Sequence, residues 1–298
     1  MIKYKNIPNL FIIGAPKCGT SSLIYYLSNH PQIFVSKVKE PHYFNKDSGH
    51  RYYFEEKDYL NLFSKANESH SYLCEGSVWY MYSEVAIDEI LRFNPNAKFI
   101  IMLRNPVSMF FSLHQEFLFG GSEDIKSAKE AWEIQEQRRN GKNIPNGCSD
   151  PRLLQYGEAC KLGKQAFRVT QKIPEENLIF VLLDDLKSKS DSTYNKILKF
   201  LGVAPLSLES YDIINKKKGR ISFTLSRFFI FITKLKKKFG IKRGLGVLSA
   251  LNKLNISQDV SNKYGEVEIL KPILLEYFKK DILLLEKVIN KDLSHWKS

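Results

Sequence analysis

Long apolar runs and paired metal-binding or disulfide-forming residues are absent from this sequence of 298 residues. No stretch approaches the roughly 18 consecutive apolar residues of a membrane-spanning helix. The apolar run near the N-terminus is brief and follows Pro8, so we expect no secretory signal. The six histidines include no i, i+4 pair, and four cysteines show no paired spacing: Cys18, Cys74, Cys148 and Cys160. We therefore expect a cytoplasmic protein without a metal site or a disulfide framework.

Acidic residues are also scarce relative to basic ones. The chain has 32 Asp and Glu against 45 Lys and Arg, a formal charge of +13. Such a charge attracts nucleotides, acidic glycans, nucleic acid or anionic lipid, although excess lysine for solubility explains part of it. We find no zinc finger, aromatic RNA-binding motif or helix-turn-helix, so a nucleic-acid partner is not expected. With 43% hydrophobic residues, the chain is long enough to bury one core, and we predict a single domain over residues 1–298.

Strand-like and helix-like segments alternate along the chain. Short apolar runs predict strands at Leu10–Ile13, Ile33–Val35, Phe99–Leu103 and Leu178–Leu183. Helices are predicted at residues 21–28, 85–93, 106–119, 128–139, 153–170, 192–201 and 266–289. In the last helix, one apolar face comprises Leu270, Ile273, Leu274, Phe278, Ile282 and Leu285. This alternation predicts a three-layer α/β/α fold with a central parallel sheet and ligands at the carboxyl ends of its strands. With the glycine-bearing loop after the first strand, the expected fold is of the P-loop nucleotide-binding type.

The segment Leu10–Leu23 is the most informative part of the sequence. An apolar strand meets a turn containing Gly14, Lys17 and Gly19, and hydroxyl residues then open a helix. Backbone N–H groups and the helix dipole converge there, as in an anion-binding site. A nucleoside-triphosphate P-loop has lysine directly before the magnesium-ligating hydroxyl, but Thr20 stands at the lysine position. ATP or GTP hydrolysis is therefore not expected; an ordinary strand–turn–helix remains the plain alternative.

Residues 14–23 resemble the 5'-phosphosulfate loop, G-x-x-K-x-G-T-[ST]-x-L, of sulfotransferases that use 3'-phosphoadenosine 5'-phosphosulfate (PAPS). Residues 99–112 resemble the family's 3'-phosphate motif, in which a strand delivers Arg104 and Ser112 follows on a helix. The resemblance implies that Lys17 stabilises the leaving phosphate and that Arg104 and Ser112 hold the 3'-phosphate. It further implies that the 5'-phosphate is bound by Cys18, Gly19, Thr20, Ser21 and Ser22.

The segment Lys37–Phe44 resembles the K-E-x-x-[FY]-F element of the glycan sulfotransferase branch. The resemblance implies that Glu40 is the catalytic base and that His42 assists by hydrogen bonding or by orienting the acceptor. Neighbouring lysines should lower the pKa of Glu40 and weaken it as a base, unless partial burial offsets their effect. A solvated turn for Glu40 and a packed loop histidine for His42 are the alternatives.

Two further segments bear on the site. In the family, a late basic loop closes over the 3'-phosphate, which implies the same role for Lys218, Gly219 and Arg220; a solvated basic face is the alternative. Glycan-modifying relatives often carry Glu-Lys-[ST]-Pro in mid-chain, where this sequence has Glu75-Gly76-Ser77. The lysine is thus missing, and the role of Glu75 stays open.

An apolar aromatic run and a basic run follow each other within residues 221–243. This pattern suits an interfacial helix on the inner face of an anionic membrane, a lid over an anionic glycan, or a core helix. The turn-rich segments 141–151 and 240–265 are either walls of an acceptor cleft or surface loops. We predict a PAPS-dependent sulfotransferase that acts on a hydroxyl group of a carbohydrate or glycan precursor. An amine is the lesser option for the acceptor group. A P-loop kinase or other nucleotide-dependent transferase and a polyanion-binding protein are the alternatives.

Overall fold

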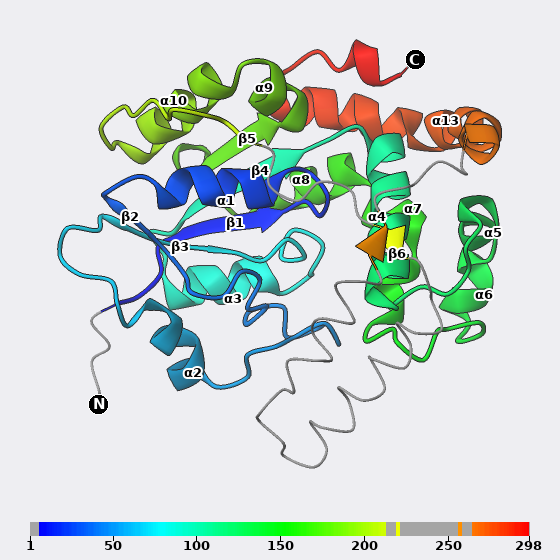
Figure 1. Ribbon diagram of the computed structural model, residues 1–298, viewed down its shortest axis with the longest axis horizontal. Coiled ribbons are helices and arrows are strands. Elements are labelled where there is room, and N and C mark those ends of the chain that lie inside the picture. Colours follow the sequence, from blue (N-terminus) through cyan, green and yellow to red (C-terminus); the bar gives the residue numbers. More distant parts are fainter. Residues whose placement is uncertain (1–5, 213–218, 221–255, 258–263, 298) are drawn as a thin grey trace. The chain divides into compact units, whose positions relative to one another are not determined.

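Five parallel strands form a sheet in the order β2-β3-β1-β4-β5 (Figure 1). They are β1 (Leu10–Gly14), β2 (Ile33–Val35), β3 (Tyr72–Gly76), β4 (Lys98–Leu103) and β5 (Leu178–Leu182). This computed structural model describes residues 6–212, 219–220, 256–257 and 264–297. The predicted α/β fold with a central parallel sheet is confirmed. All four predicted strands are present within a residue at each end.

Strand β3 was not predicted, although it lies between β2 and β1. Strands buried in a parallel sheet usually have continuous apolar runs, and Glu75 and Gly76 interrupt the run here. Glycine at position 76 allows close packing, because a Cβ atom there would lie 2.5 Å from Cδ1 of Ile24 in helix α1 (Thr20–Ser28) and would push that side chain aside. The polar strand end is therefore shaped by close packing against that helix.

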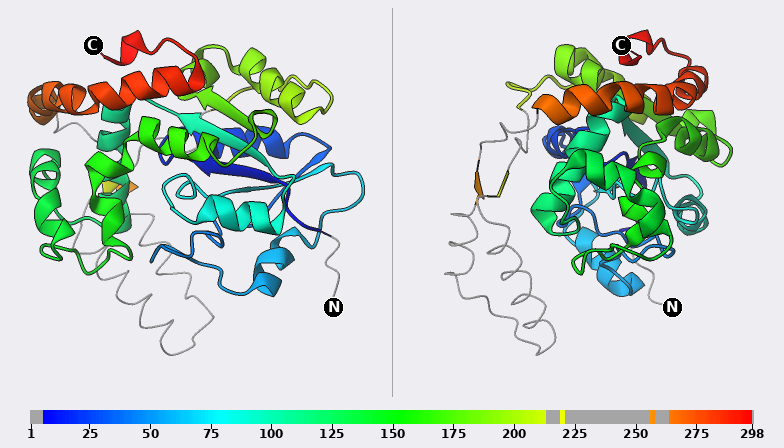
Figure 2. Two further views of the ribbon diagram at one scale, coloured as in Figure 1. Left: turned by 180° about the vertical axis from the view of Figure 1, so that it is seen from behind. Right: turned by 90° about the vertical axis from the view of Figure 1, so that its right-hand side faces the viewer.

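Helices cover both faces of the sheet. Figure 1 shows α1 (Thr20–Ser28) in front of the strands, and Figure 2 shows α3 (Ala86–Phe93) and α8 (Leu162–Thr170) in front when the fold is seen from behind. On the first face, α10 (Ser190–Leu201) contacts α1: the Tyr194 hydroxyl donates to the Tyr26 carbonyl at 3.0 Å. The remaining helices are α2 (Glu56–Leu60), α4 (Pro106–Gly120), α5 (Ala128–Glu133), α6 (Gln135–Arg139), α7 (Tyr156–Ala159), α9 (Leu183–Ser188), α10 (Ser190–Leu201) and α13 (Tyr264–Ile289). Short 3-10 turns occupy Asn61–Phe63, Pro151–Leu154, Glu175–Asn177 and Ser294–Trp296. No helix in these described ranges is both long and apolar enough to cross a bilayer.

Two predicted long helices are broken. The helix predicted over 128–139 divides at Ile134, whose ψ of 5° departs from helical values. The helix predicted over 153–170 is a 3-10 turn followed by α7 and α8, because Lys161 has a non-helical ψ of 76°. Asp281 of α13 then caps α8 by accepting the N–H groups of Gly163 and Lys164, both at 2.8 Å. The apolar face predicted for α13 is buried except at Ile273, which is 50% exposed.

The chain divides into two units. The first comprises residues 1–109, 159–215 and 277–298 and holds the sheet. The second comprises residues 110–158 and 216–276. A buried ion pair between Glu123 and Arg138 stabilises the second unit, and the Tyr156 hydroxyl donates to Glu123 at 2.8 Å. Whether the chain is one domain stays a prediction.

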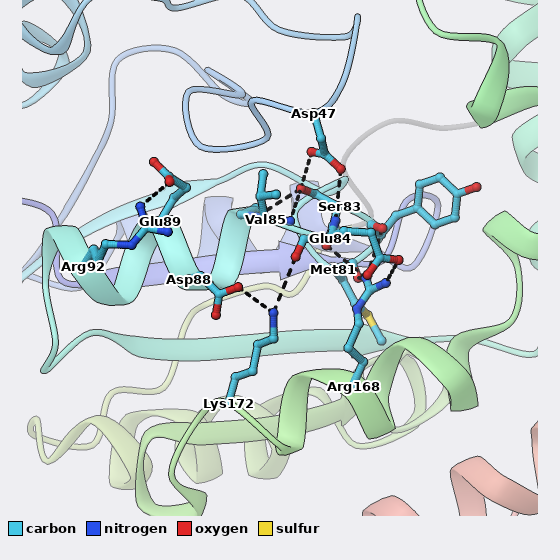
Figure 3. A network of polar contacts seen from close by, with 12 residues as sticks. Asp47, Met81, Ser83, Glu84, Val85, Asp88, Glu89, Arg92, Arg168 and Lys172 are labelled. Atoms are coloured by element: carbon cyan, nitrogen blue, oxygen red, sulfur yellow. Dashed lines mark hydrogen bonds and ion pairs between the residues drawn. The ribbon is translucent and has the colours of Figure 1, made fainter.

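Polar contacts hold the start of α3 against α8 in the first unit (Figure 3). The guanidinium group of Arg168 donates to the carbonyls of Met81, Tyr82 and Ser83 at 2.7, 3.0 and 3.0 Å, and pairs with the Glu84 carboxylate. Asp47 accepts the Ser83 hydroxyl at 2.6 Å on the other side of the turn. One cation thus satisfies three carbonyls that follow strand β3.

We expect Arg168→Ala to lower the free energy of unfolding by about 2–3 kcal/mol, because three carbonyls lose a charged donor. Urea denaturation measures the change. Arg92→Ala, in the same region but with a side chain 69% exposed in a surface ion pair, is the control and should cost less than about 0.5 kcal/mol. Equal losses in the two variants would contradict this role for Arg168.

Candidate functional site

The predicted site residues of the first unit gather at one edge of its sheet. Lys17 follows β1, Glu40 and His42 follow β2, and Arg104 follows β4. Because all strands are parallel, their carboxyl ends lie at the same edge. The chain passes from β1 to β2 on one side and later to β4 on the other side of β1, which makes β1 a topological switch point. Ligands of open α/β sheets bind at such points.

The loop after β1 has the backbone of an anion cradle. Gly19 has φ of +88°, which favours glycine, and a Cβ atom there would also have to displace Leu183 Cδ1, 2.6 Å away. No side chain caps the start of α1, and the N–H groups of Thr20 and Ser21 have no acceptor among the described residues. The guanidinium group of Arg104 donates to the Lys17 carbonyl at 3.1 Å and fixes the loop. These features fit a phosphate or sulfate group.

Cys18 has a different place from its neighbours. Its side chain is buried, its N–H donates to the Ala15 carbonyl at 3.3 Å, and its thiol lies 3.4 Å from the Pro16 carbonyl. Burial raises the pKa of the thiol to about 12. Both donors of Cys18 make contacts within the turn and help to shape it, and its predicted role in binding the 5'-phosphate stays a prediction.

The three residues predicted to act in catalysis share a strained backbone. Lys17, Glu40 and His42 have φ of 63°, 63° and 50°. The other non-glycine residues with positive φ in the described ranges are Asn143 and Asn290, a residue type that tolerates this conformation. Side chains with a Cβ atom adopt it at a cost of about 1–3 kcal/mol each, and such residues cluster at functional sites. Surrounding contacts must hold each of them in place.

Glu40 is an ionised, partly buried carboxylate. Its side chain is 26% exposed, pairs with the Lys39 ammonium group and lies 3.3 Å from Nε2 of the fully buried His42 imidazole. Burial raises the pKa of Glu40, but the hydrogen bond from His42 and the charge of Lys39 outweigh it and hold the pKa at about 2. Burial does not offset the lysine, so the expected weakening of this base stands.

A second carboxyl group, Glu75, lies beneath this segment with no exposed surface. It accepts the Ser77 hydroxyl at 2.8 Å and the Tyr59 hydroxyl at 3.4 Å. The Ser77 oxygen in turn accepts the backbone N–H of His42 at 3.0 Å. Burial raises the pKa of Glu75 to about 7, against the hydrogen bonds from Ser77, Tyr80 and Tyr59 that lower it. The network positions the strained segment from below.

Tyr80 extends the same network. Its hydroxyl accepts the N–H groups of Tyr43 at 2.9 Å and Phe44 at 3.2 Å, and it also bonds to Glu75. Tyr80 is fully buried. The sequence did not indicate that Tyr59 and Tyr80 belong to the site. The motif around Glu75 was the one signal that pointed to this cluster.

Aromatic side chains enclose the imidazole of His42. The rings of His50, Tyr52 and Tyr80 have centroids 4.8, 5.7 and 6.1 Å away, and all three are tilted or edge-on to it. With Nε2 facing Glu40, Nδ1 is buried and has no hydrogen-bond partner among the described residues. His42 is thus a packed histidine that also contacts the predicted base, which joins the two interpretations given above.

The other predicted cofactor residues lie elsewhere in the chain. Ser112 is a half-buried residue of α4 in the second unit. Gly219 and Arg220 form a short strand, β6, that pairs antiparallel with β7 (Ile256–Ser257) in the same unit. Lys218, the segment 221–243 and most of 240–265 lie outside the described residues. Their roles stay predictions.

Comparison with known proteins places the chain in a family. The sulfotransferase domain matches residues 8–223, so the chain belongs to the sulfotransferase domain family. It is 26% identical over 270 residues to mouse carbohydrate sulfotransferase 15, covering 70% of this chain and 46% of that protein. It is 24% identical over 226 residues to a bifunctional heparan sulfate N-deacetylase/N-sulfotransferase 1 of Caenorhabditis elegans, covering 72% and 24%. The chain therefore spans less than half the length of these relatives.

The crystal structure of a sulfotransferase from Alicyclobacillus acidocaldarius has the same fold, with a TM-score of 0.71 and 24% identity. The match covers 98% of this chain and 99% of that one.

The raised pKa of Glu75 predicts a pH-dependent stability. A carboxyl whose pKa rises from 4.5 to about 7 on folding stabilises the fold fully below pH 4.5, and this contribution is lost as pH rises through 7. Glu75→Gln mimics the protonated form and removes the loss. Relative to the parent protein, the variant should gain up to about 3 kcal/mol between pH 4.5 and pH 8.

Urea denaturation at both pH values tests this, since other titrating groups are common to both proteins and cancel in the difference. Glu209→Gln, at an exposed position, is the control and should show no pH-dependent difference. A constant difference between Glu75→Gln and the parent protein at pH 4.5 and pH 8 would refute the assignment.

Proposed function

We propose that this chain transfers a sulfuryl group from PAPS to a hydroxyl of a carbohydrate acceptor. The observation that carries the proposal is the left-handed backbone shared by Lys17, Glu40 and His42 at the carboxyl edge of the sheet. Membership of the sulfotransferase domain family supports the reaction class. The loop supports the donor, because its unpaired N–H groups, Lys17 and Arg104 suit a doubly phosphorylated nucleotide.

On the donor side, the chain supplies positive charge and fixed N–H groups. Lys17 stabilises the charge that builds on the phosphate oxygen as its bond to sulfur breaks. The start of α1 holds the 5'-phosphate through the N–H groups of Thr20 and Ser21 and the hydroxyls of Thr20, Ser21 and Ser22. Arg104 binds the 3'-phosphate through its planar fork of donors.

On the acceptor side, Glu40 takes the proton of the hydroxyl. Its pKa of about 2 makes it too weak a base to deprotonate an ordinary alcohol in advance. The acceptor oxygen becomes strongly acidic only as its new bond to sulfur forms, and a weak carboxylate base is sufficient at that stage. His42 orients Glu40 through the contact at 3.3 Å. Proton transfer therefore follows, or accompanies late, formation of the oxygen–sulfur bond.

The carbohydrate acceptor is supported by the relatives. Two of them carry the names carbohydrate sulfotransferase and heparan sulfate N-sulfotransferase. The similarity to the K-E-x-x-[FY]-F element of the glycan branch points the same way, because Lys39, Glu40, Tyr43 and Phe44 match it.

Nucleotide binding tests the donor. We expect 3'-phosphoadenosine 5'-phosphate, the spent donor, to bind without metal and more tightly than 5'-ADP or magnesium-ATP in calorimetry. Arg104→Ala should weaken this binding at least tenfold, because the 3'-phosphate loses a charge-assisted contact. Arg92→Ala, a surface arginine of α3, should bind as the parent protein does. Preference for magnesium-ATP would instead favour the kinase alternative.

Removal of the base tests the chemistry. We expect Glu40→Gln to lower kcat about 10²–10⁴-fold in transfer of labelled sulfate from PAPS to a panel of neutral and uronic-acid polysaccharides. Nucleotide binding should not weaken. Because the pKa of Glu40 is about 2, the parent protein should show no loss of kcat near pH 4.5 from protonation of this group.

Glu209→Gln, at an exposed position of the same unit, is the control and should retain full activity. Full activity of Glu40→Gln would exclude Glu40 as the base, and transfer to none of the polysaccharides would contradict a carbohydrate acceptor.

A further inference from the structure

A groove of about 770 Å³ lies wholly within the first unit, lined in part by residues that follow β2. Such a volume is typical of sites that bind small ligands or parts of larger ones. Its wall includes Lys37 after β2, the exposed rings of Tyr52 and Phe54, and the polar side chains of Glu55, Asp58 and Lys65. Nothing in the donor chemistry described above uses these residues.

Tyr52 joins the groove to the catalytic segment. It lines the groove, its ring packs 5.7 Å from that of His42, and its hydroxyl lies 3.3 Å from Nε2 of His50. His42 in turn contacts Glu40. A chain-like acceptor with one unit at Glu40 would therefore place a neighbouring unit in the groove.

The side chain of Phe54 is exposed but fixed by contacts with Arg51. Phe54 is 63% exposed, and nearby Tyr52 is 56% exposed. Two exposed aromatic rings close together are typical of a binding surface. The Arg51 guanidinium stacks over the Phe54 ring at 4.9 Å and over the Tyr43 ring at 5.4 Å. Arg51 also donates to the Tyr43 carbonyl at 3.1 Å and the Phe54 carbonyl at 3.3 Å. The ring is thus pre-organised, which lowers the entropy cost of binding.

The groove carries no net charge. Lys37 and Lys65 are balanced by Glu55 and Asp58, and neither lysine forms an ion pair with another described residue. This balance contrasts with the excess of 45 basic over 32 acidic residues in the whole chain. A groove without net charge offers a densely sulfated or carboxylated unit no net electrostatic attraction. Ammonium and carboxylate groups can instead donate to and accept from sugar hydroxyls, while aromatic faces contact the C–H groups of a sugar ring.

We infer that this groove is an acceptor subsite that binds an uncharged sugar unit next to the unit that is sulfated. The inference rests on the proposed function for the identity of the neighbouring unit. The stacking is provided by Tyr52 and Phe54, and the hydroxyl contacts by Lys37, Glu55, Asp58 and Lys65.

Saturation-transfer NMR on the full chain tests this subsite with three probes: chitotetraose and cellotetraose as uncharged oligosaccharides, and a chondroitin sulfate tetrasaccharide as an anionic one. We expect saturation transfer to at least one uncharged probe and little to the anionic one. Phe54→Ala should reduce the signal at least fivefold. Phe167→Ala, which removes another exposed ring (49%) from the same unit, is the matched control and should leave the signal unchanged.

A second variant tests the charge argument. Glu55→Gln combined with Asp58→Asn leaves two lysines unopposed, so it should gain binding of the anionic tetrasaccharide at least fivefold. The subsite is refuted if neither uncharged probe binds, if only the anionic probe binds to the parent protein, or if Phe54→Ala behaves like Phe167→Ala. Binding of 3'-phosphoadenosine 5'-phosphate is measured by calorimetry in parallel. Absence of nucleotide binding would overturn the proposed function, whereas the NMR result decides separately whether the groove binds sugar.

Discussion

The buried carboxyl of Glu75 is the constraint on which the site depends. It lies at the end of β3, where a charged residue in a parallel strand must find partners, and it takes hydroxyl groups from Ser77, Tyr59 and Tyr80. Two of these hydroxyls also accept backbone N–H groups of the segment that follows β2. The N–H groups of His42 and Tyr43 are held by this network, and the N–H of Glu40 donates to the Gly76 carbonyl at 3.0 Å, so the left-handed backbone of Glu40 and His42 is held in place. Removing the network would allow the segment to relax and Glu40 to move.

The two carboxyl groups of the site have environments that push their pKa values apart. Burial raises the pKa of Glu75 to about 7, whereas the contacts with His42 and Lys39 keep that of Glu40 at about 2 despite its partial burial. Near neutral pH, Glu40 therefore carries a full negative charge, whereas Glu75 is only partly ionised. Such a separation assigns different roles to two neighbouring carboxyls: Glu40 stays ionised, and Glu75 supports it.

The sequence predicted most of the fold because its strongest signals are local. Short apolar runs located four strands, and Gly14, Lys17 and Gly19 located the loop. Strand β3 was not predicted because Glu75 interrupts its apolar run. The burial of Glu75 depends on tyrosines that come close to it only in the folded chain. The helix break at Lys161 was not predicted for a similar reason. Asp281, which caps α8 after the break, lies more than a hundred residues further along the chain. Hydrophobic periodicity indicates which element a segment can form. Contacts with residues distant in the sequence determine where that element begins and ends.

The same distinction applies to the site. Motifs placed Glu40 and Lys17 at strand ends, but nothing in them indicated that both residues have positive φ. The groove has no motif at all: Tyr52 and Phe54 come from a polar, aromatic segment without clear periodicity, and Lys37 comes from the end of another strand. The donor proposed above would be recognised through its phosphate groups, and short motifs can encode a phosphate site. An acceptor is recognised by surface shape and charge balance, which arise only when separate segments meet; this is why the sequence identifies the donor chemistry more readily than the acceptor.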